Sequence, residues 1–350
     1  MENLRTGKTE LGLLPFNDLN RFKNFIKNHW DKNHIFVVDS IVFNWQHKGA
    51  TNYHYLIAKS DGEIIGAHGV IPLNHFDQKL TNNQIFIALW RVLENRGIGI
   101  GLRIFQEILK IYNPTFIAGL PMNSKVTKFY NRFGFECKTM SHHVMLSQEK
   151  KNFFVAHVPE NISTKGSFFA CDANIKKLCS DSLKKIDSEH LYNYQTPIKS
   201  DDYIINRYLN HPVYKYFVYS ITVNSSVKIL AVVRPIHING NTICTIVDYI
   251  GSNDDFPLLS VLMRDLLKRY NAEFVDIYSY GIPDNIISKS GFLNVKEISD
   301  LIIPGLFEPF VKKNVDIICG FYNNGNDSPV RIFKGDSDAD RPSKIEKLGQ

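Results

Sequence analysis

The chain has 350 residues, of which 44% are apolar, and it carries a net charge of +6 with a pI near 8.8. This length suits two domains with packed cores, and the absence of a concentrated basic stripe argues against a nucleic-acid binder. Five scattered cysteines without a C-x-x-C pair predict reduced thiols in the cytoplasm rather than disulfides or a zinc site. No apolar run reaches transmembrane length, so we expect no membrane partner.

The first 93 residues predict one helix and then strands. Residues 19–29 have amphipathic helical spacing, and residues 53–59 and 64–72 are strand-like runs on either side of a Ser-Asp-Gly-Glu turn at 60–63. Residues 85–93 form another apolar strand-like run. Strands that are followed by helices further along the chain indicate a mixed α/β sheet flanked by helices.

Residues 96–101 read Arg-Gly-Ile-Gly-Ile-Gly and lie between the strand-like run 85–93 and a helix-like run at 102–112. Glycines at such a junction let backbone N–H groups approach a ligand, and the helix adds its unpaired amides and positive dipole end. The pattern fits neither the dinucleotide motif G-x-G-x-x-G nor the P-loop motif G-x-x-x-x-G-K-[ST]. The segment therefore predicts a pyrophosphate site of another class.

Residues 123–135 read Asn-Ser-Lys-Val-Thr-Lys-Phe-Tyr-Asn-Arg-Phe-Gly-Phe and follow a short apolar strand at 115–120. Val126, Phe129, Tyr130 and Phe133 recur at helical spacing, and Gly134 is placed to end the helix. The spacing predicts a second helix, with a closing strand of the same unit at 143–146.

Together these segments resemble the GNAT acyltransferases. Arg96, Gly99 and Gly101 match their motif A, R-x-x-G-x-G, and residues 123–135 resemble motif B, N-x-x-A-x-x-x-Y-x-x-x-G-F, with Val126 at the small-residue position. The resemblance implies that Tyr130 is the general acid toward the coenzyme A thiolate. It also implies that acyl-CoA is bound by the strand end, the glycine loop and the second helix, through Arg91, Val92, Leu93, Arg96, Gly97, Ile98, Gly99, Ile100, Gly101, Asn123 and Tyr130.

The second half repeats the order of the first. We expect a GNAT-like domain at 1–150, a linker with a helix around 174–186 at 151–201, and a degenerate GNAT-like domain at 202–350. Residues 282–292 end in Gly-Phe like residues 123–135, but residues 252–257 read Ser-Asn-Asp-Asp-Phe-Pro, where the first half has glycines. Two carboxylates would repel a pyrophosphate. The pattern predicts one CoA site, with the second domain contributing to the acceptor site.

Four further segments resemble tandem-GNAT sugar N-acyltransferases of bacterial O-antigen and other surface-polysaccharide clusters. They are Trp45-Gln46 and residues 207–212, 247–249 and 334–342. This resemblance implies transfer of an acetyl or 3-hydroxybutanoyl group from acyl-CoA to a dTDP-linked 3-amino-3,6-dideoxyhexose. The alternatives are a GNAT enzyme acting on a peptide, polyamine or aminoacyl acceptor, and a non-catalytic acyl-CoA-binding protein. The oligomeric state is not encoded in any pattern found.

The general base has several candidates. Asp248 interrupts an apolar run and is proposed to contact the acceptor amine, with a hydrogen-bonded structural carboxylate as the alternative. His68 and Glu94 are the other candidates, although a lone histidine on an apolar strand is more often structural. The residues predicted to bind the acceptor are Trp45, Asp248, Tyr249 and Tyr278, although each of the aromatic ones is individually more typical of a core residue.

No metal site is predicted. His142 and His143 lack a carboxylate or cysteine partner at metal-ligand spacing. Asp336, Asp338 and Asp340 resemble half of a calcium loop, but the glycine and the terminal glutamate of such a loop are missing.

Overall fold

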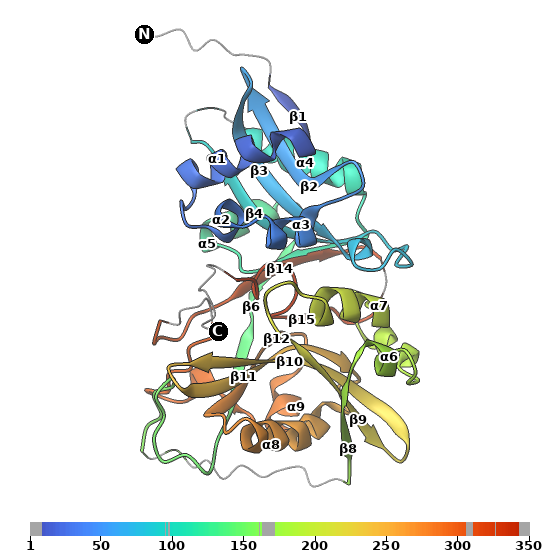
Figure 1. Cartoon of the computed structure of the whole chain (residues 1–350), viewed down its shortest axis with the longest axis vertical. Helices are drawn as coiled ribbons and strands as arrows, with labels where there is room; N and C mark the ends of the chain where they lie inside the picture. Colours follow the sequence, from blue (N-terminus) through green and yellow to red (C-terminus); the bar gives the residue numbers. More distant parts are fainter. Residues whose placement is uncertain are drawn as a thin grey trace.

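The computed structural model describes residues 9–94, 96, 99–160, 162, 172–305, 311–325 and 327–342. Figure 1 shows two mixed sheets, one in the upper part of the molecule and one in the lower part. We call them the N-terminal sheet and the C-terminal sheet. The predicted class, α/β with two sheet-bearing units, is confirmed. No helix within the described ranges has the length and apolar character needed to span a bilayer.

Within the described residues, the N-terminal sheet has the order β1-β2-β3-β4-β5-β14-β6. The β4–β5 pair is parallel, and the other neighbours are antiparallel. The strands are β1 Glu10–Pro15, β2 Asn52–Ser60, β3 Glu63–Pro72, β4 Gln84–Val92, β5 Phe116–Gly119, β6 Glu136–Thr139 and β14 Ile318–Asn323.

Helices cover both faces of this sheet because its strands alternate apolar side chains between the two faces. On β2, Tyr55 packs with α1 while Leu56 packs with α4, and both side chains are fully buried. The helices on the first face are α1 Leu19–His29, α2 Ile35–Val38 and α3 Ile41–His47. Those on the second face are α4 Ile100–Tyr112 and α5 Ser124–Asn131. The helices predicted at 19–29, 102–112 and 123–135 are confirmed within a few residues.

The C-terminal sheet has the order β13-β7-β12-β11-β10-β9-β8, with β15 paired to β12. Its strands are β7 Ser141–Leu146, β8 Asn174–Leu178, β9 Phe217–Val223, β10 Ser226–Ile238, β11 Asn241–Gly251, β12 Phe274–Tyr280, β13 Leu293–Asn294 and β15 Ile332–Phe333. The remaining α-helices are α6 Ser180–Leu183, α7 Asp201–Ile204, α8 Leu259–Arg269 and α9 Asp284–Lys289. Short 3₁₀ or π turns cover Phe16–Asp18, Leu73–His75, Glu189–Tyr194, Ile205–Leu209, Phe256–Leu258 and Val295–Glu297.

The two halves exchange strands, which corrects the prediction for residues 143–146. Strand β7 does not close the N-terminal sheet, because it pairs with β12 and β13 of the C-terminal sheet. Strand β14, from near the end of the chain, lies between β5 and β6 instead. The boundaries at 150 and 201 stay a prediction about independent folding units.

The helix expected around 174–186 is wrong over its first part. Residues Asn174–Leu178 form β8, which pairs antiparallel with the edge of β9, and only Ser180–Leu183 is helical. Pairing with an available sheet edge outweighs the weak local helix preference of this lysine-rich segment.

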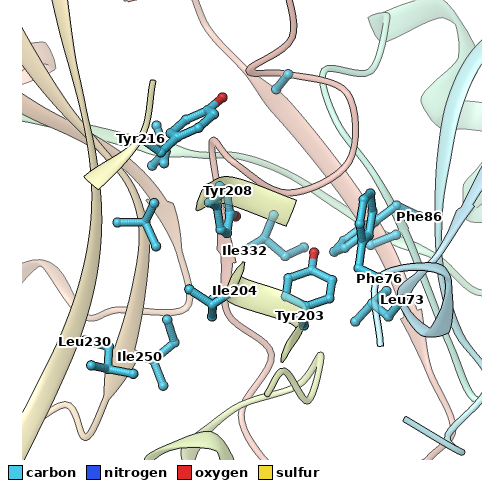
Figure 2. Close-up of a cluster of buried hydrophobic side chains, with 14 of the residues drawn as sticks. Leu73, Phe76, Phe86, Tyr203, Ile204, Tyr208, Tyr216, Leu230, Ile250 and Ile332 are labelled. Carbon is cyan, nitrogen blue, oxygen red and sulfur yellow. The ribbon is translucent and has the colours of Figure 1, made fainter. Parts of the chain in front are cut away.

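A buried cluster joins the two halves. Figure 2 shows side chains of the N-terminal half facing residues of α7 and of the π turn after it, which in turn face the C-terminal sheet. The labelled members are Leu73, Phe76, Phe86, Tyr203, Ile204, Tyr208, Tyr216, Leu230, Ile250 and Ile332, none more than 5% exposed. Because this cluster is continuous, residues from the end of the chain are held in a fixed position against the N-terminal sheet.

Candidate functional site

A pocket opens where β4 and β5 separate. The two strands pair only from Gln84 with Phe116 to Ile87 with Gly119; β5 then ends while β4 continues to Val92. The pocket has a volume of about 200 Å³. Its walls come from β4, the turn after β5, α5 and two distant segments, namely Trp30, Ile87, Ala88, Leu89, Trp90, Gly119, Leu120, Pro121, Met122, Asn123, Val126, Tyr130, Asp338 and Arg341.

The pocket joins the two faces of the N-terminal sheet. Asn123, Val126 and Tyr130 line it from the face covered by α4 and α5. Trp30, directly after α1, lines it together with Asp338 and Arg341 from the opposite face. Two molecules entering from opposite faces would meet between the separated strands.

Strand β4 carries a bulge at this point. His68 pairs with Trp90 and Val70 pairs with Ile87, so β4 uses one residue more than β3 over this stretch. Two carbonyl groups of β4 accept hydrogen bonds from side chains outside the strand. The Ile87 oxygen accepts from Ser337 Oγ at 2.7 Å, and the Leu89 oxygen accepts from the Tyr55 hydroxyl at 2.9 Å. These contacts fix the backbone that lines the pocket.

The β4 amides available to a ligand differ in part from those expected. The Leu93 N–H donates to the Ile65 oxygen at 2.9 Å, and by the antiparallel alternation the Arg91 N–H also points toward β3. The N–H groups of Trp90 and Val92 therefore point toward the opposite edge, where β5 has ended. Of the three predicted residues at 91–93, only Val92 has a backbone N–H directed toward the open edge of β4. The N–H of Trp90 has the same direction.

The glycine loop ends at a helix N-terminus without a side-chain cap. Gly99 is the N-cap of α4, with φ +82° and ψ −3°, a left-handed conformation that favours glycine, and nothing lies within 4 Å of the position of an added Cβ. Arg96 is exposed, while Gly97 and Ile98 lie outside the described residues. The first amides of α4 are therefore able to bind an anion.

Two of the predicted loop residues have a packing role. Ile100 is buried in the core between α4 and the sheet. At Gly101 an added Cβ would lie 2.8 Å from Cζ2 of Trp90, so this glycine makes room for the indole that lines the pocket. The glycine spacing thus serves both the turn and the packing of Trp90.

Tyr130 reaches the pocket from α5, and its ring is only 2% exposed. The ring packs against Trp90, Phe105 and Phe135 with centroid distances of 5.7, 5.4 and 5.0 Å. Burial, together with the nearby Cys137, raises the pKa of Tyr130 well above its ordinary value, so the phenol stays protonated at neutral pH. Its hydroxyl has no hydrogen-bond partner among the described residues and is available to a ligand.

Asn123 caps α5 and also lines the pocket. Its side-chain oxygen accepts from the Lys125 N–H at 2.9 Å, as expected for an N-cap residue. Capping the helix therefore leaves Asn123 in the pocket wall, where the resemblance predicted contact with acyl-CoA.

His68 does not line the pocket. It is fully buried, its ring stacks on Trp90 at 4.9 Å, and neither ring nitrogen has a hydrogen-bond partner within the described chain. Desolvation lowers the pKa of His68 to about 3. Its position favours the structural alternative over that of a base. Glu94, the other candidate, likewise does not line the pocket.

Asp248 lies in a buried ionic cluster outside the pocket. Its carboxylate accepts from Lys199 Nζ at 2.7 and 2.8 Å and from the Tyr208 hydroxyl at 2.8 Å, while Lys199 also contacts Asp336 at 2.9 Å. Burial raises the pKa of the Asp248 carboxyl, and Lys199 opposes that change. With no exposed surface, Asp248 has the surroundings of the structural carboxylate considered as its alternative.

The other predicted acceptor residues also lie away from Tyr130. Trp45 donates to the Asn206 oxygen at 3.3 Å and packs on His211, where it contributes to the contact between the halves. Tyr249 is fully buried and donates to the Ser252 oxygen, and Tyr278 stacks on His142 at 3.8 Å. Of the predicted CoA residues, Asn123 and Tyr130 line the pocket, and none of the predicted acceptor residues does.

Sequence reasoning missed Trp30, Met122, Asp338 and Arg341 as pocket residues. Asp338 was noted only as part of half a calcium loop, although residues 334–342 and Gln46, which contacts Asp338, both belonged to segments of the second resemblance. In the described parts of the chain, no three His, Cys, Asp or Glu side chains gather in a way that could hold a metal ion.

Comparisons with known proteins agree with this geometry. The sequence model of the Acetyltransferase (GNAT) family matches residues 20–135, a span that includes β2 to β5, α4, α5 and most of the pocket wall. No curated protein matches the sequence.

Solved structures share the fold over most of the chain. The GCN5-related N-acetyltransferase from Anabaena variabilis is 11% identical, over 91% of this chain and 73% of that chain, with a TM-score of 0.55. The GCN5-related N-acetyltransferase from Kribbella flavida is also 11% identical, over 91% and 72%, with a TM-score of 0.51. At such identities the similarity shows the fold. Residues 20–135 thus match the Acetyltransferase (GNAT) family, and the chain is a CoA-dependent N-acyltransferase with the fold of tandem GNAT domains.

Proposed function

We propose that the pocket between β4 and β5 is the acyl-transfer site, and that acyl-CoA enters from the α4–α5 face while the acceptor amine enters from the α1 face. The observation that supports this most is the opening between the two strands, which connects Tyr130 on one face with Trp30 and Asp338 on the other. Such an opening lets the amine reach the thioester directly, without a covalent enzyme intermediate.

The donor would be held mainly by backbone groups. The uncapped first turn of α4, beside Gly99, suits the pyrophosphate of CoA, and the exposed Arg96 adds a positive charge nearby. The N–H groups of Trp90 and Val92, which face the open edge of β4, suit the thioester carbonyl.

The chemistry requires a nucleophile, an oxyanion site and an acid. The neutral acceptor nitrogen attacks the thioester carbon, and the carbonyl oxygen becomes an oxyanion stabilised by the β4 amides. When the C–S bond breaks, the thiolate takes the phenolic proton of Tyr130, which burial keeps protonated until that step. The products are an amide and free CoA.

We further propose that the acceptor is a dTDP-linked 3-amino-3,6-dideoxyhexose and that the acyl group is acetyl or 3-hydroxybutanoyl, in the cytoplasm, as part of O-antigen or other surface-polysaccharide synthesis. The support is the resemblance in four segments. Two of these segments support the proposal because Gln46 donates to Asp338 at 3.0 Å, and because Asp338 and Arg341 of residues 334–342 line the pocket. In this proposal residues 1–150 hold acyl-CoA, and residues 151–201 and 202–350 support the acceptor side.

A thiol-release assay tests the proposal. Purified protein is mixed with acetyl-CoA or 3-hydroxybutanoyl-CoA and with dTDP-3-amino-3,6-dideoxyhexoses, a peptide amine or a polyamine. We expect release of CoA with the nucleotide sugar and inhibition by free dTDP. Turnover of the peptide or polyamine without inhibition by dTDP would overturn the sugar assignment, and no turnover with any amine would overturn the proposed function.

A further inference from the structure

Residues 334–342, which we call the return segment, lead from the C-terminal sheet into the wall of the pocket. The segment follows β15 and is fixed from both halves. Arg207 Nη2 donates to the oxygens of Gly335 and Ser337 at 3.2 and 2.6 Å, and Ser337 Oγ donates to the Ile87 oxygen of β4 at 2.7 Å. The segment is thus fixed by hydrogen bonds to its backbone from Arg207 and by a hydrogen bond from its Ser337 side chain to β4.

The return segment carries three alternating carboxylates, and two of them pair with residues that do not line the pocket. Asp336 accepts from the Phe333 N–H at 2.9 Å and pairs with Lys199 at 2.9 Å. Asp340 pairs with Arg234 at 2.8 Å and accepts from the Tyr216 hydroxyl at 2.7 Å. Only Asp338 of the three lines the pocket.

Asp338 is held in place but not saturated with partners. One carboxylate oxygen accepts from Gln46 Nε2 at 3.0 Å, and the other forms an ion pair with Arg341 Nε at 2.7 Å. Arg341 is held in turn by His34 at 2.9 Å. Since an ionised carboxylate accepts about four hydrogen bonds, each oxygen of Asp338 can still accept one from a ligand in the pocket.

The charged and titratable groups around Asp338 are few. Arg341 is the cation beside it, and the Tyr55 hydroxyl donates to the Leu89 oxygen. Burial lowers the pKa of His34 to about 3, and it also lowers the pKa of His47, whose Nε2 lies 3.0 Å from Gln46 Nε2, so both rings are neutral. No other carboxylate and no histidine lines the pocket within the described chain. Tyr130 approaches from the opposite face.

We propose that Asp338 binds the acceptor ammonium group and takes its proton. This inference rests on the proposed function and assigns its missing base. The N–H bond of the ammonium breaks and its proton moves to the Asp338 carboxylate, which leaves a lone pair on nitrogen. That lone pair forms the C–N bond, the C–S electrons leave with sulfur, and the thiolate takes the proton of Tyr130. The second amine proton is released to solvent as the amide forms.

Asp338→Asn is the sharpest test because the structure can accommodate it. Gln46 Oε1 has no partner within the described residues, so rotation of the Gln46 amide would let this oxygen accept from the new amide group. We expect kcat with the acceptor that the wild type acylates to fall by about 100-fold or more at pH 7. Calorimetry should show unchanged affinity for acetyl-CoA, and circular dichroism an unchanged fold.

The pH profile separates a proton acceptor from a structural residue. Free amine becomes abundant as the pH rises, so the loss in Asp338→Asn should shrink by about tenfold between about pH 7 and about pH 9.5. Asp340→Asn is the matched control in the same segment. It should lower thermal stability because it breaks the buried pair with Arg234, and any loss of rate should not depend on pH.

Three results would overturn the inference. If the Asp338→Asn variant has the same kcat as the wild type, no proton passes to this carboxylate. An equal loss at both pH values with normal acetyl-CoA affinity would make Asp338 structural. A wild-type protein that binds acetyl-CoA but acylates no amine would overturn the proposed function, and the assignment of Asp338 with it; this result is recognised because it appears before any substitution is made.

Discussion

The two sheets contain the same parallel strand pair, but only one of them opens into a pocket. In the N-terminal sheet, β4 and β5 separate beyond Ile87, and the space between them lies open to both faces. In the C-terminal sheet, β11 and β12 pair from Cys244 to Ile246, and beyond this pairing residues 332–335 hydrogen-bond to both strands. Two sheets with the same parallel strand pair can therefore differ in function, because other residues fill the gap in one sheet and leave it open in the other.

Defined hydrogen bonds hold residues 332–335 in the gap between β11 and β12. Phe333 and Ile332 of β15 pair with Ser279 and Tyr280 of β12, and the Gly335 N–H donates to the Val247 oxygen of β11 at 2.7 Å. An added Cβ at Gly335 would lie 2.7 Å from that oxygen, so glycine is required for this close approach. The same segment then continues to the pocket of the N-terminal sheet. One stretch of chain therefore closes one gap and supplies a wall to the other.

The largest expected effect comes from the buried cluster behind this filling. Asp248→Ala should destabilise the protein by about 3–5 kcal/mol because it removes one partner of a buried ion pair with Lys199. Urea unfolding measures the loss, and the exposed Asp254→Ala, on the loop after the same strand, should change stability by less than about 0.5 kcal/mol. A stable Asp248→Ala protein that binds acyl-CoA but has lost turnover would instead make Asp248 catalytic, as first predicted.

Acid should weaken the pocket-bearing half through its buried histidines. Desolvation lowers the pKa of His34, His54 and His68 to about 3, about 4 and about 3, against about 6.5 in the unfolded chain. Below pH 6.5 the unfolded state binds protons that the folded state does not, so the free energy of unfolding decreases as the pH is lowered. We expect a loss of about 1 kcal/mol per histidine between pH 6.5 and 5.5, measured by urea unfolding at both values.

His68→Phe sharpens this prediction. The histidine ring nitrogens have no partner within the described residues, so a phenyl ring should keep the stacking on Trp90 and flatten the pH dependence. Equal stability of the wild type at pH 6.5 and 5.5 would mean that these rings are not held neutral.

Tyr130→Phe tests the donor face of the pocket. Removing the hydroxyl should lower kcat by about 100-fold while acyl-CoA affinity stays within about twofold, because the phenol acts only as the C–S bond breaks. Single-turnover kinetics and calorimetry measure the two quantities. Tyr322→Phe, on β14 of the same sheet, is the control and should keep the wild-type rate. An unchanged rate in Tyr130→Phe would remove the general-acid assignment.

The smallest expected effect is at the glycine loop. Gly99→Ala should cost about 1 kcal/mol of stability through its left-handed conformation, and its methyl group should lower acyl-CoA affinity by about tenfold. Gly62 has nearly the same φ, +80°, with equally open surroundings in the turn between β2 and β3. Gly62→Ala should therefore have the same cost in stability and leave acyl-CoA affinity unchanged. Equal affinities in the two variants would mean that CoA does not approach Gly99.

Local periodicity predicted most of the N-terminal half but not the exchange of strands. The helical spacing of Phe22, Phe25 and Ile26 in α1 and of Phe129, Tyr130 and Phe133 around α5 records which faces are buried, so these elements were predictable. Strands β7 and β14 have ordinary strand patterns, which do not specify a partner strand. Their pairing depends on contacts between distant parts of the chain.

For the candidate site too, the residues in local motifs were predictable from the sequence, and the residue from a distant segment was not. Gly99, Asn123 and Tyr130 lie in motifs with fixed spacing; Asn123 and Tyr130 line the opening after β5, and Gly99 is the N-cap of α4. Asp338 comes from the other end of the sequence. Its neighbours Asp336 and Asp340 are also aspartates, but they pair with Lys199 and Arg234 and do not line the pocket. No spacing rule distinguishes these three carboxylates, because the distinction arises only when the return segment packs against β4.

A crystal structure of the full chain with acetyl-CoA tests the central comparison most directly. We expect one CoA per chain, with its pyrophosphate at the first turn of α4 and its thioester between Trp90 and Tyr130, and with β15 and Gly335 still filling the gap between β11 and β12. CoA bound between β11 and β12, or a thioester remote from Tyr130, would contradict it.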